Sequence, residues 1–251
     1  MEKRFLYHGE AVAASGAIQL PFKEVIDIQA SVALSMDGGY GSARVDGFKY
    51  RELLSFSSAH SVVIGAYSDA DKAWQTLATT TIENLNVMGV VTADRIVARI
   101  TSKHPANGGE PSIIPLGSSI ENLRIAGVSA DVDLATDLFS RLDTFTGLQK
   151  AYTSDRKSLD PLLMAESDGK TLPQSKGGMC GVTLVRGCSY RDKTSVTQNA
   201  IKVDHFGTVH LAEMFVSGNV RRLTMLRIEL GCPVEGGMQF GSVGGNGSPW
   251  P

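Results

Sequence analysis

The feature that most constrains the fold is a short pattern that occurs twice. Ile-Glu-Asn-Leu-x-(Val/Ile)-x-Gly-Val runs from Ile82 to Val90 and again, 38 positions later, from Ile120 to Val128. Alternating apolar residues are typical of strands, and Asn and Gly permit a bulge or a tight turn. Each copy is therefore predicted to form a strand, a bend and a second strand. A solenoid needs at least three stacked repeats. A sandwich with related hairpins is favoured, and a short β-helical stack is the alternative.

Other segments have the same strand periodicity. Period-two alternation indicates strands at 30–36 and 61–67. The segment 208–216 is apolar at both odd and even positions, which is typical of a central strand covered on both faces. The loop 217–219 favours a hairpin that joins this strand to 220–230.

One segment has a helical period instead. Leu138, Phe139, Leu142, Phe145 and Leu148 recur at helical spacing, which predicts one amphipathic helix at about 137–152. The last segment, 236–251, is rich in glycine and is interpreted as a C-terminal tail, either flexible or an extended arm. The predicted fold is mainly β: a single antiparallel β-sandwich-like domain over 1–235, with one helix and this tail.

Composition and charge exclude several classes of function. The formal net charge is −2 and the pI is about 6.2, so no nucleic-acid partner is expected. The sequence has no run of about 18 apolar residues, so no membrane-spanning helix is expected. The first ten residues do not fit a signal peptide, which predicts a cytoplasmic chain as written, or an extracellular one if a leader has been removed.

The cysteines indicate neither a metal site nor a disulfide framework. The three residues, Cys180, Cys188 and Cys232, form no Cys-x-x-Cys pair, and their number is odd. Whether Cys180 and Cys188 pair across a hairpin stays open, with free buried thiols favoured. We predict no metal and no cofactor.

Two regions resemble a known family. The segments 207–218 and 223–231 resemble the closing hairpin of the bacterial choice-of-anchor domains, and so do 90–99 and 123–127. The resemblance extends over more than half of the chain and consists of strand patterns. It implies a β-rich extracellular module of unassigned biochemical function, and it supplies no catalytic residues.

Polar residues that could perform chemistry are few. Asp204 and His205 precede the strand that carries His210 and Glu213, a set that could serve as a metal site or an acid–base pair. Strict strand alternation, however, places His210 and Glu213 on opposite faces. His60 follows two serines, but no Gly-x-Ser-x-Gly motif supports a hydrolase.

The sequence favours a non-enzymatic function. We expect a structural, self-assembling or ligand-binding domain that forms a homo-oligomer or binds a small molecule or glycan. The first alternative is a hydrolase or isomerase that uses His60 or the region 204–213. The second is a carbohydrate-binding module with aromatic platforms at Tyr40, Tyr50, Tyr67 or Trp74.

Overall fold

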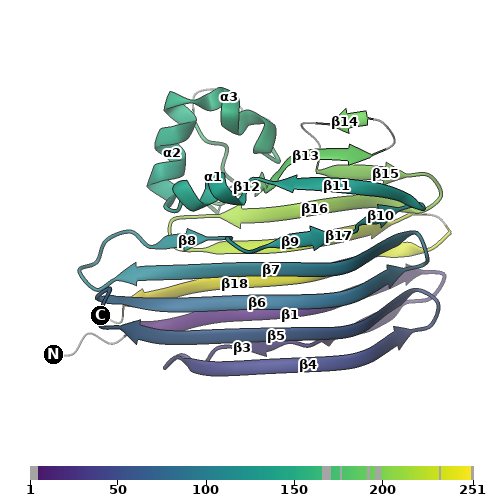
Figure 1. The fold of residues 1–251 in the computed structure, drawn as a ribbon, viewed down its shortest axis with the longest axis horizontal. Helices are drawn as coiled ribbons and strands as arrows, with labels where there is room; N and C mark the ends of the chain where they lie inside the picture. Colours follow the sequence, from purple (N-terminus) through teal and green to yellow (C-terminus); the bar gives the residue numbers. More distant parts are fainter. Residues whose placement is uncertain are drawn as a thin grey trace.

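The protein is a sandwich of two antiparallel β-sheets, as the sequence predicts. The computed structural model describes residues 5–165, 171–175, 177–190, 193–195, 199–231 and 233–249. Figure 1 shows β4 to β7 of one sheet lying over β1, β18 and β17 of the other. The described strands of sheet A, in spatial order, are β12 (Cys180–Thr183), β16 (Gly207–Val216), β17 (Arg221–Leu230), β18 (Glu235–Pro249), β1 (Phe5–Leu20) and β2 (Glu24–Gln29), with β15 (Ala200–Val203) beside β16 and β3 (Val32–Ala33) beside β1.

Sheet B has the larger number of described strands. In spatial order they are β14 (Lys193–Ser195), β13 (Val185–Tyr190), β11 (Val128–Leu134), β10 (Arg124–Ile125), β7 (Val91–Pro105), β6 (Ala73–Val87), β5 (Leu54–Ser68) and β4 (Gly39–Tyr50), with β8 (Ser112–Ile114) and β9 (Ser119–Glu121) beside β7. Buried apolar side chains from both sheets fill the space between them, among them Ile96 and Ile100 of sheet B and Met225 and Phe240 of sheet A. This core leaves the outer face of each sheet free for other roles.

The repeated motif is structural, and its two copies flank β7. Ile82 of the first copy and Ile120 of the second both pair with Ile96. Asn84 and Asn122 both adopt left-handed backbone conformations, with φ of 53° and 51°. The turns at 88–89 and 126–127 both have two consecutive residues with positive φ, the geometry of tight hairpin turns. The predicted strand, bend and strand are confirmed in both copies.

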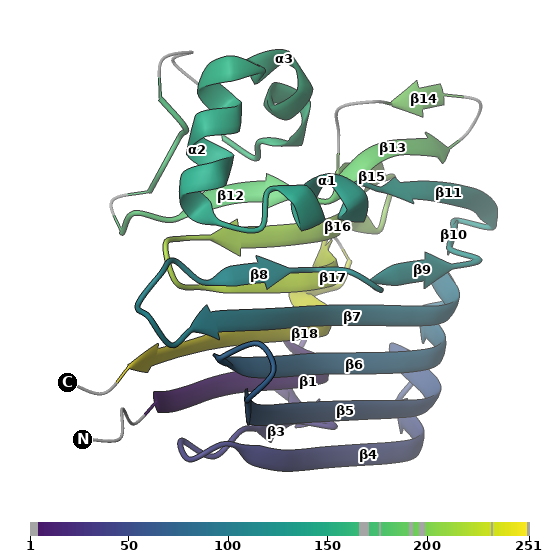
Figure 2. The same ribbon diagram turned by 60° about the vertical axis from the view of Figure 1, so that its left-hand side comes forward.

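The predicted single helix at 137–152 is wrong, because it is broken in two. The structure has α1 (Thr136–Arg141) and α2 (Phe145–Ser154), followed by α3 (Arg156–Leu159) and the 3₁₀ turn η1 (Asp160–Leu162). Thr144 ends the break as the N-cap of α2, since its hydroxyl accepts a hydrogen bond from Gly147 N at 3.0 Å. Figure 2 shows these helices gathered beside β12, at the end of the sandwich far from β4.

A buried arginine fastens the helices to sheet A at this break. Arg221 of β17 is 1% exposed, and its Nη2 donates to the Leu142 carbonyl oxygen at 2.6 Å. This carbonyl ends α1, where a cation complements the helix dipole. Burial lowers the pKa of Arg221 to about 10, against the opposing influence of Asp143 and Glu110. The guanidinium therefore stays protonated at neutral pH.

Of the two alternatives for the glycine-rich segment, the flexible tail is wrong, because the extended strand β18 occupies most of it. β18 pairs with β17 on one side and with β1 on the other. Its glycines allow close packing: a Cβ on Gly247 would lie 2.1 Å from Phe5 Cζ, and one on Gly236 would lie 2.3 Å from the Ala17 carbonyl oxygen. Trp250 and Pro251 lie outside the described residues.

Three smaller expectations have mixed outcomes. Only Val32–Ala33 of the strand predicted at 30–36 pairs regularly, although Leu34 N still donates to the Gly9 carbonyl oxygen at 2.7 Å. Cys180 and Cys188 are buried and free, and Cys232 lies outside the described residues. No helix in the described part of the chain is long and apolar enough to cross a membrane.

Candidate ligand-binding groove

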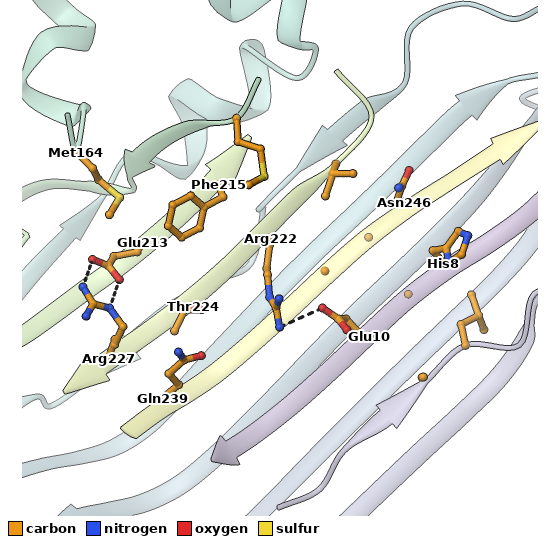
Figure 3. A pocket seen from close by; sticks show the side chains of 17 residues that line it. His8, Glu10, Met164, Glu213, Phe215, Arg222, Thr224, Arg227, Gln239 and Asn246 are labelled. Atoms are coloured by element: carbon orange, nitrogen blue, oxygen red, sulfur yellow. Dashed lines mark hydrogen bonds and ion pairs between the residues drawn. The ribbon is translucent and has the colours of Figure 1, made fainter. Parts of the chain in front are cut away.

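A groove of about 910 Å³ crosses the outer face of sheet A. We call it the outer groove; it is lined by side chains from β16, β17, β18, β1 and β3, together with Met164 and Met179 (Figure 3). Its volume lies within the range typical of small-molecule sites, about 300–1,000 Å³. The outer groove is therefore the candidate functional site.

Strand register places the lining residues in rows across the sheet. One row runs from Phe215 to Arg222, Gly244, Glu10 and Ala33, each paired with the next. Because Gly244 has no side chain, it forms a low floor between the charged side chains of its neighbours. Arg222 Nη2 lies 3.3 Å from Glu10 Oε1 across that floor.

Backbone hydrogen bonds position the two walls. On one side, Met164 N donates to the Gly181 carbonyl oxygen at 3.0 Å, and Leu163 pairs with Val182. The short segment at 163–164 therefore extends sheet A beyond β12. On the other side, the bond from Leu34 N to the Gly9 carbonyl oxygen holds Leu34 beside β1. The outer groove thus has walls from segments that are far apart in the sequence.

A kink in β16 determines which side chains reach this face. Ala212 has φ of 48°, and the pairing with β17 skips it. Leu211 and Ala212 are both fully buried, so the alternation changes phase between them. His210 and Glu213 consequently lie on the same face, with His210 Nδ1 3.4 Å from Glu213 Oε1. The expectation that they lie on opposite faces is wrong.

The same kink explains why the sequence of β16 is apolar at odd and even positions. Phe215, which strict alternation groups with Val209 and Leu211, lies 42% exposed on the outer face. The prediction that this strand is covered on both faces is therefore wrong. β16 has one buried face, and the residues that form it change from odd to even numbers at Ala212.

Glu213 belongs to a network of charged groups at one end of the outer groove. Its side chain is 4% exposed and accepts two hydrogen bonds from Arg227, at 2.6 Å from Nε and 2.8 Å from Nη2. Arg227 also bonds to Glu229, and His210 Nε2 lies 3.4 Å from Glu229 Oε2. The hydrogen bonds to Glu213 raise the pKa of Arg227, and the bond from Arg227 lowers the pKa of the Glu229 carboxyl.

This network is better suited to holding charge in place than to proton transfer. Both oxygens of Glu213 are occupied by Arg227, in the bidentate geometry that gives the strongest charge-assisted hydrogen bonds. A general base needs a carboxylate oxygen or imidazole nitrogen within reach of a substrate proton. The arrangement instead fixes Arg227 and Glu213 in one orientation beside the groove.

The other predicted catalytic candidates lie elsewhere. Asp204 and His205 are exposed in the turn between β15 and β16, where His205 has φ of 57°. His60 is exposed on β5 of the other sheet, paired with Arg44 and Thr81. The structure brings together only His210 and Glu213 of the five. Within the described ranges, no group of three or more His, Cys, Asp or Glu residues could hold a metal ion.

The predicted aromatic platforms do not meet in the outer groove. Trp74 is buried and stacks on Phe5, with ring centroids 4.8 Å apart and planes 5° apart. Tyr40 and Tyr67 are exposed on sheet B, and the Tyr50 hydroxyl bonds to Glu24. None of the four lines the groove.

Sequence reasoning missed most of the groove. Arg222 resembles a solvated strand-edge charge in the sequence, and Met164 lies in a segment without a clear period. The sequence contains one indication of the site: the polar residues Arg222, Thr224 and Arg227 of β17. Their spacing changes from two residues to three after Thr224. Without the partner strands, this alternation does not identify a site.

Fold and groove together define an antiparallel β-sandwich with an open, charge-lined face. By sequence, the chain belongs to a family described as a domain of unknown function, DUF8256, whose model matches residues 5–170. No curated protein and no solved structure matches the chain significantly. The matched part includes Glu10, Leu34 and Met164, whereas Arg222 and Arg227 lie after it, so the outer groove combines both parts of the chain.

Proposed function

We propose that this protein is a non-enzymatic binding domain that holds a small-molecule ligand in the outer groove. The observation that supports it most directly is the row of paired residues from Phe215 to Ala33. This row places the ring of Phe215, the cation of Arg222, the bare backbone of Gly244 and the carboxylate of Glu10 in order across the outer groove. Binding sites typically combine apolar surface with a few fixed polar groups in this way.

Other polar groups of the groove have capacity to bind a ligand. The side chains of Gln239 and His8 make no hydrogen bond to the described residues, and both line the groove. Thr224 bonds to Ser242 through its hydroxyl at 3.0 Å. These groups could recognise a ligand without rearrangement of the sheet, because strand pairing holds the backbone of each residue in place.

A glycine substitution tests this proposal. Gly244→Val would raise the groove floor, since a Cβ there lies 3.2 Å from the flexible Glu10 side chain. The matched control is Gly187→Val on β13, where a Cβ meets nothing within 4 Å. We expect isothermal titration with dodecanoate, maltose and a tripeptide to reveal a ligand whose affinity Gly244→Val reduces at least tenfold and Gly187→Val leaves unchanged. Equal affinity for both variants would contradict the groove as the site.

The enzymatic alternative receives less support. It rests on His60 and on the region 204–213, which the fold separates. Substituting His60, His205 and His210 separately by Ala tests it. An activity that any one of these changes abolished would favour an enzyme.

A specific observation favours self-association as a second function. Leu20, Phe22, Val25 and Ile28 are exposed on or next to the β1–β2 hairpin, and Val25 is 73% exposed. Clusters of exposed apolar residues mark interaction surfaces. Antiparallel pairing of two copies about Val25 would place the Lys23 of each opposite the Asp27 of the other, which is why we propose a second copy as partner.

Native mass spectrometry tests the homo-oligomer. We expect a dimer for the native chain and a monomer for Val25→Lys, with Val128→Lys, an exposed position on β11, as the matched control. A monomeric native chain at micromolar concentration would exclude this second function.

The kinship with the bacterial choice-of-anchor domains is a further proposal. It is supported by the segments 207–218 and 223–231, which fall largely on β16 and β17 and pair as a hairpin. An extracellular location is part of the same proposal. Fractionation of the producing cells tests the location: recovery of the chain only from the cytoplasm would contradict the extracellular location and agree with the cytoplasmic one expected for the sequence as written.

A further inference from the structure

One end of the outer groove is an exposed apolar surface. Phe215, Met164 and Met179 are 42%, 36% and 43% exposed. All three also line a second cavity of about 710 Å³, whose other residues include Leu172 and Gly181. The two cavities therefore share an apolar surface, which we call the methionine patch, formed by Met164, Met179 and Phe215. Figure 3 shows Met164 and Phe215 at this end of the groove.

A cation lies directly beside the methionine patch. Arg222 pairs with Phe215 across the strands, so their side chains are neighbours on the same face. Its guanidinium has five N–H donors, and among the described residues its one ion pair is the 3.3 Å contact with Glu10. Both partners are about half exposed, and such surface pairs are weak. An anionic ligand could therefore compete with Glu10 for Arg222.

The charges around Arg222 limit the kind of anion. The ionic residues that line the outer groove are Glu10, Glu213, Arg222 and Arg227, whose charges cancel. Arg227 is already bound to Glu213 in bidentate geometry, which leaves Arg222 as the available cation. Glu10 and Glu213 would repel a phosphate dianion more strongly than a monoanion. A carboxylate fits this site, because it matches the guanidinium fork and carries a single charge.

We propose that the outer groove binds a single-chain amphiphile with a carboxylate head, such as a fatty acid. The head pairs with Arg222, and the alkyl chain lies over Phe215 between Met164 and Met179. Methionine suits this contact because its unbranched, polarisable side chain adapts to chains of different length. This inference rests on the proposed function, since it names the ligand of the same groove.

Isothermal titration with octanoate, decanoate and dodecanoate, at concentrations below micelle formation, tests the inference. We expect each added methylene to tighten binding by about fourfold, the factor associated with burying one CH₂. Arg222→Gln should weaken dodecanoate binding about tenfold and leave binding of the neutral dodecanol unchanged. Phe215→Ser should reduce the gain per methylene. Arg44→Gln, an exposed arginine paired with Asp46 on sheet B, is the matched control.

The outcomes separate this inference from the proposed function. Dodecanoate binding that is indifferent to both Arg222→Gln and Phe215→Ser would overturn the inference, as would equal affinity for the neutral dodecyl maltoside. If maltose or the tripeptide binds in a manner sensitive to Gly244→Val and the carboxylates do not bind, the inference fails and the proposed function stands. If no ligand is sensitive to Gly244→Val, both fail. Thermal unfolding of each variant verifies that it is folded.

Discussion

A buried histidine at the end of β7 should make the stability of the fold depend on pH. The side chain of His104 is 6% exposed and lies against Phe5, with ring centroids 5.0 Å apart. Burial lowers the pKa of His104 from 6.5 to about 4, because the charged imidazolium loses its hydration in this apolar cluster. The folded protein therefore resists protonation of His104 at pH values where the unfolded chain accepts a proton.

The sign and size of the effect follow from that difference. Between pH 6.5 and about 4, the unfolded chain binds a proton that the folded protein does not, so stability falls as the pH falls. Above pH 6.5 the contribution is fully present, and below about pH 4 it is lost. At about 1.4 kcal/mol for each of about 2.5 pKa units, the loss is about 3 kcal/mol.

Urea unfolding followed by tryptophan fluorescence at pH 7.5, 5.5 and 4.0 measures this loss. His104→Phe keeps an aromatic ring and cannot titrate. Between pH 7.5 and 4.0 its free energy of unfolding should therefore fall by about 3 kcal/mol less than that of the native protein. His60→Gln, at an exposed histidine, should behave as the native protein does. If His104→Phe retained the full pH dependence, the reasoning would be refuted.

Three further substitutions should have measurable effects in the same unfolding assay. Asn84→Ala should cost about 1 kcal/mol more than Asn84→Gly, because only glycine tolerates φ of 53° freely; equal losses would argue against backbone strain. Glu213→Ala should cost about 2–3 kcal/mol, because Arg227 loses its bidentate partner and keeps only the more exposed Glu229. A double-mutant cycle with Arg227→Met should show coupling; simple additivity would contradict the pair. Arg221→Ala should cost about 3 kcal/mol, since it empties a buried site and leaves the Leu142 carbonyl without this hydrogen bond. A loss below about 1 kcal/mol would be inconsistent with Arg221 holding the end of α1 against sheet A.

The repeated motif could be predicted from sequence because its requirements are local. Ile82 and Ile120 alternate with polar neighbours, and Asn84 and Asn122 are residue types that accept the left-handed conformation. Each bend and tight turn depends on the residues within it. Strand identity and the sandwich class therefore followed from the pattern alone.

The errors arise where long-range packing decides the structure. By composition the glycines of β18 allow either a flexible tail or an extended arm. Gly236 and Gly247 in fact lie where the backbone and side chains of β1 leave no room for a Cβ. The helix predicted at 137–152 ends early because Thr144 caps a new helix and Arg221 binds the intervening carbonyl. The local sequences of β18 and of 137–152 indicate neither β1, which packs against these glycines, nor β17, which carries Arg221.

The candidate site was hidden for a related reason. Ala212 is a residue type that rarely adopts positive φ, so nothing in the sequence indicates the phase change that brings His210, Glu213 and Phe215 to one face. The pairing of Phe215 with Arg222 depends on strand register, which a single sequence does not specify. Polar residues could be identified in advance, whereas their convergence could not.

Methyl NMR on protein labelled with ¹³C at the methionine methyl groups tests the central claim most directly. Met164 and Met179 lie in the outer groove, whereas Met214, Met225 and Met238 are buried between the sheets. We expect titration with dodecanoate to shift the signals of Met164 and Met179 saturably and to leave those of the three buried methionines unchanged. Saturable binding that left Met164 and Met179 unmoved would contradict the assignment of the outer groove as the ligand site.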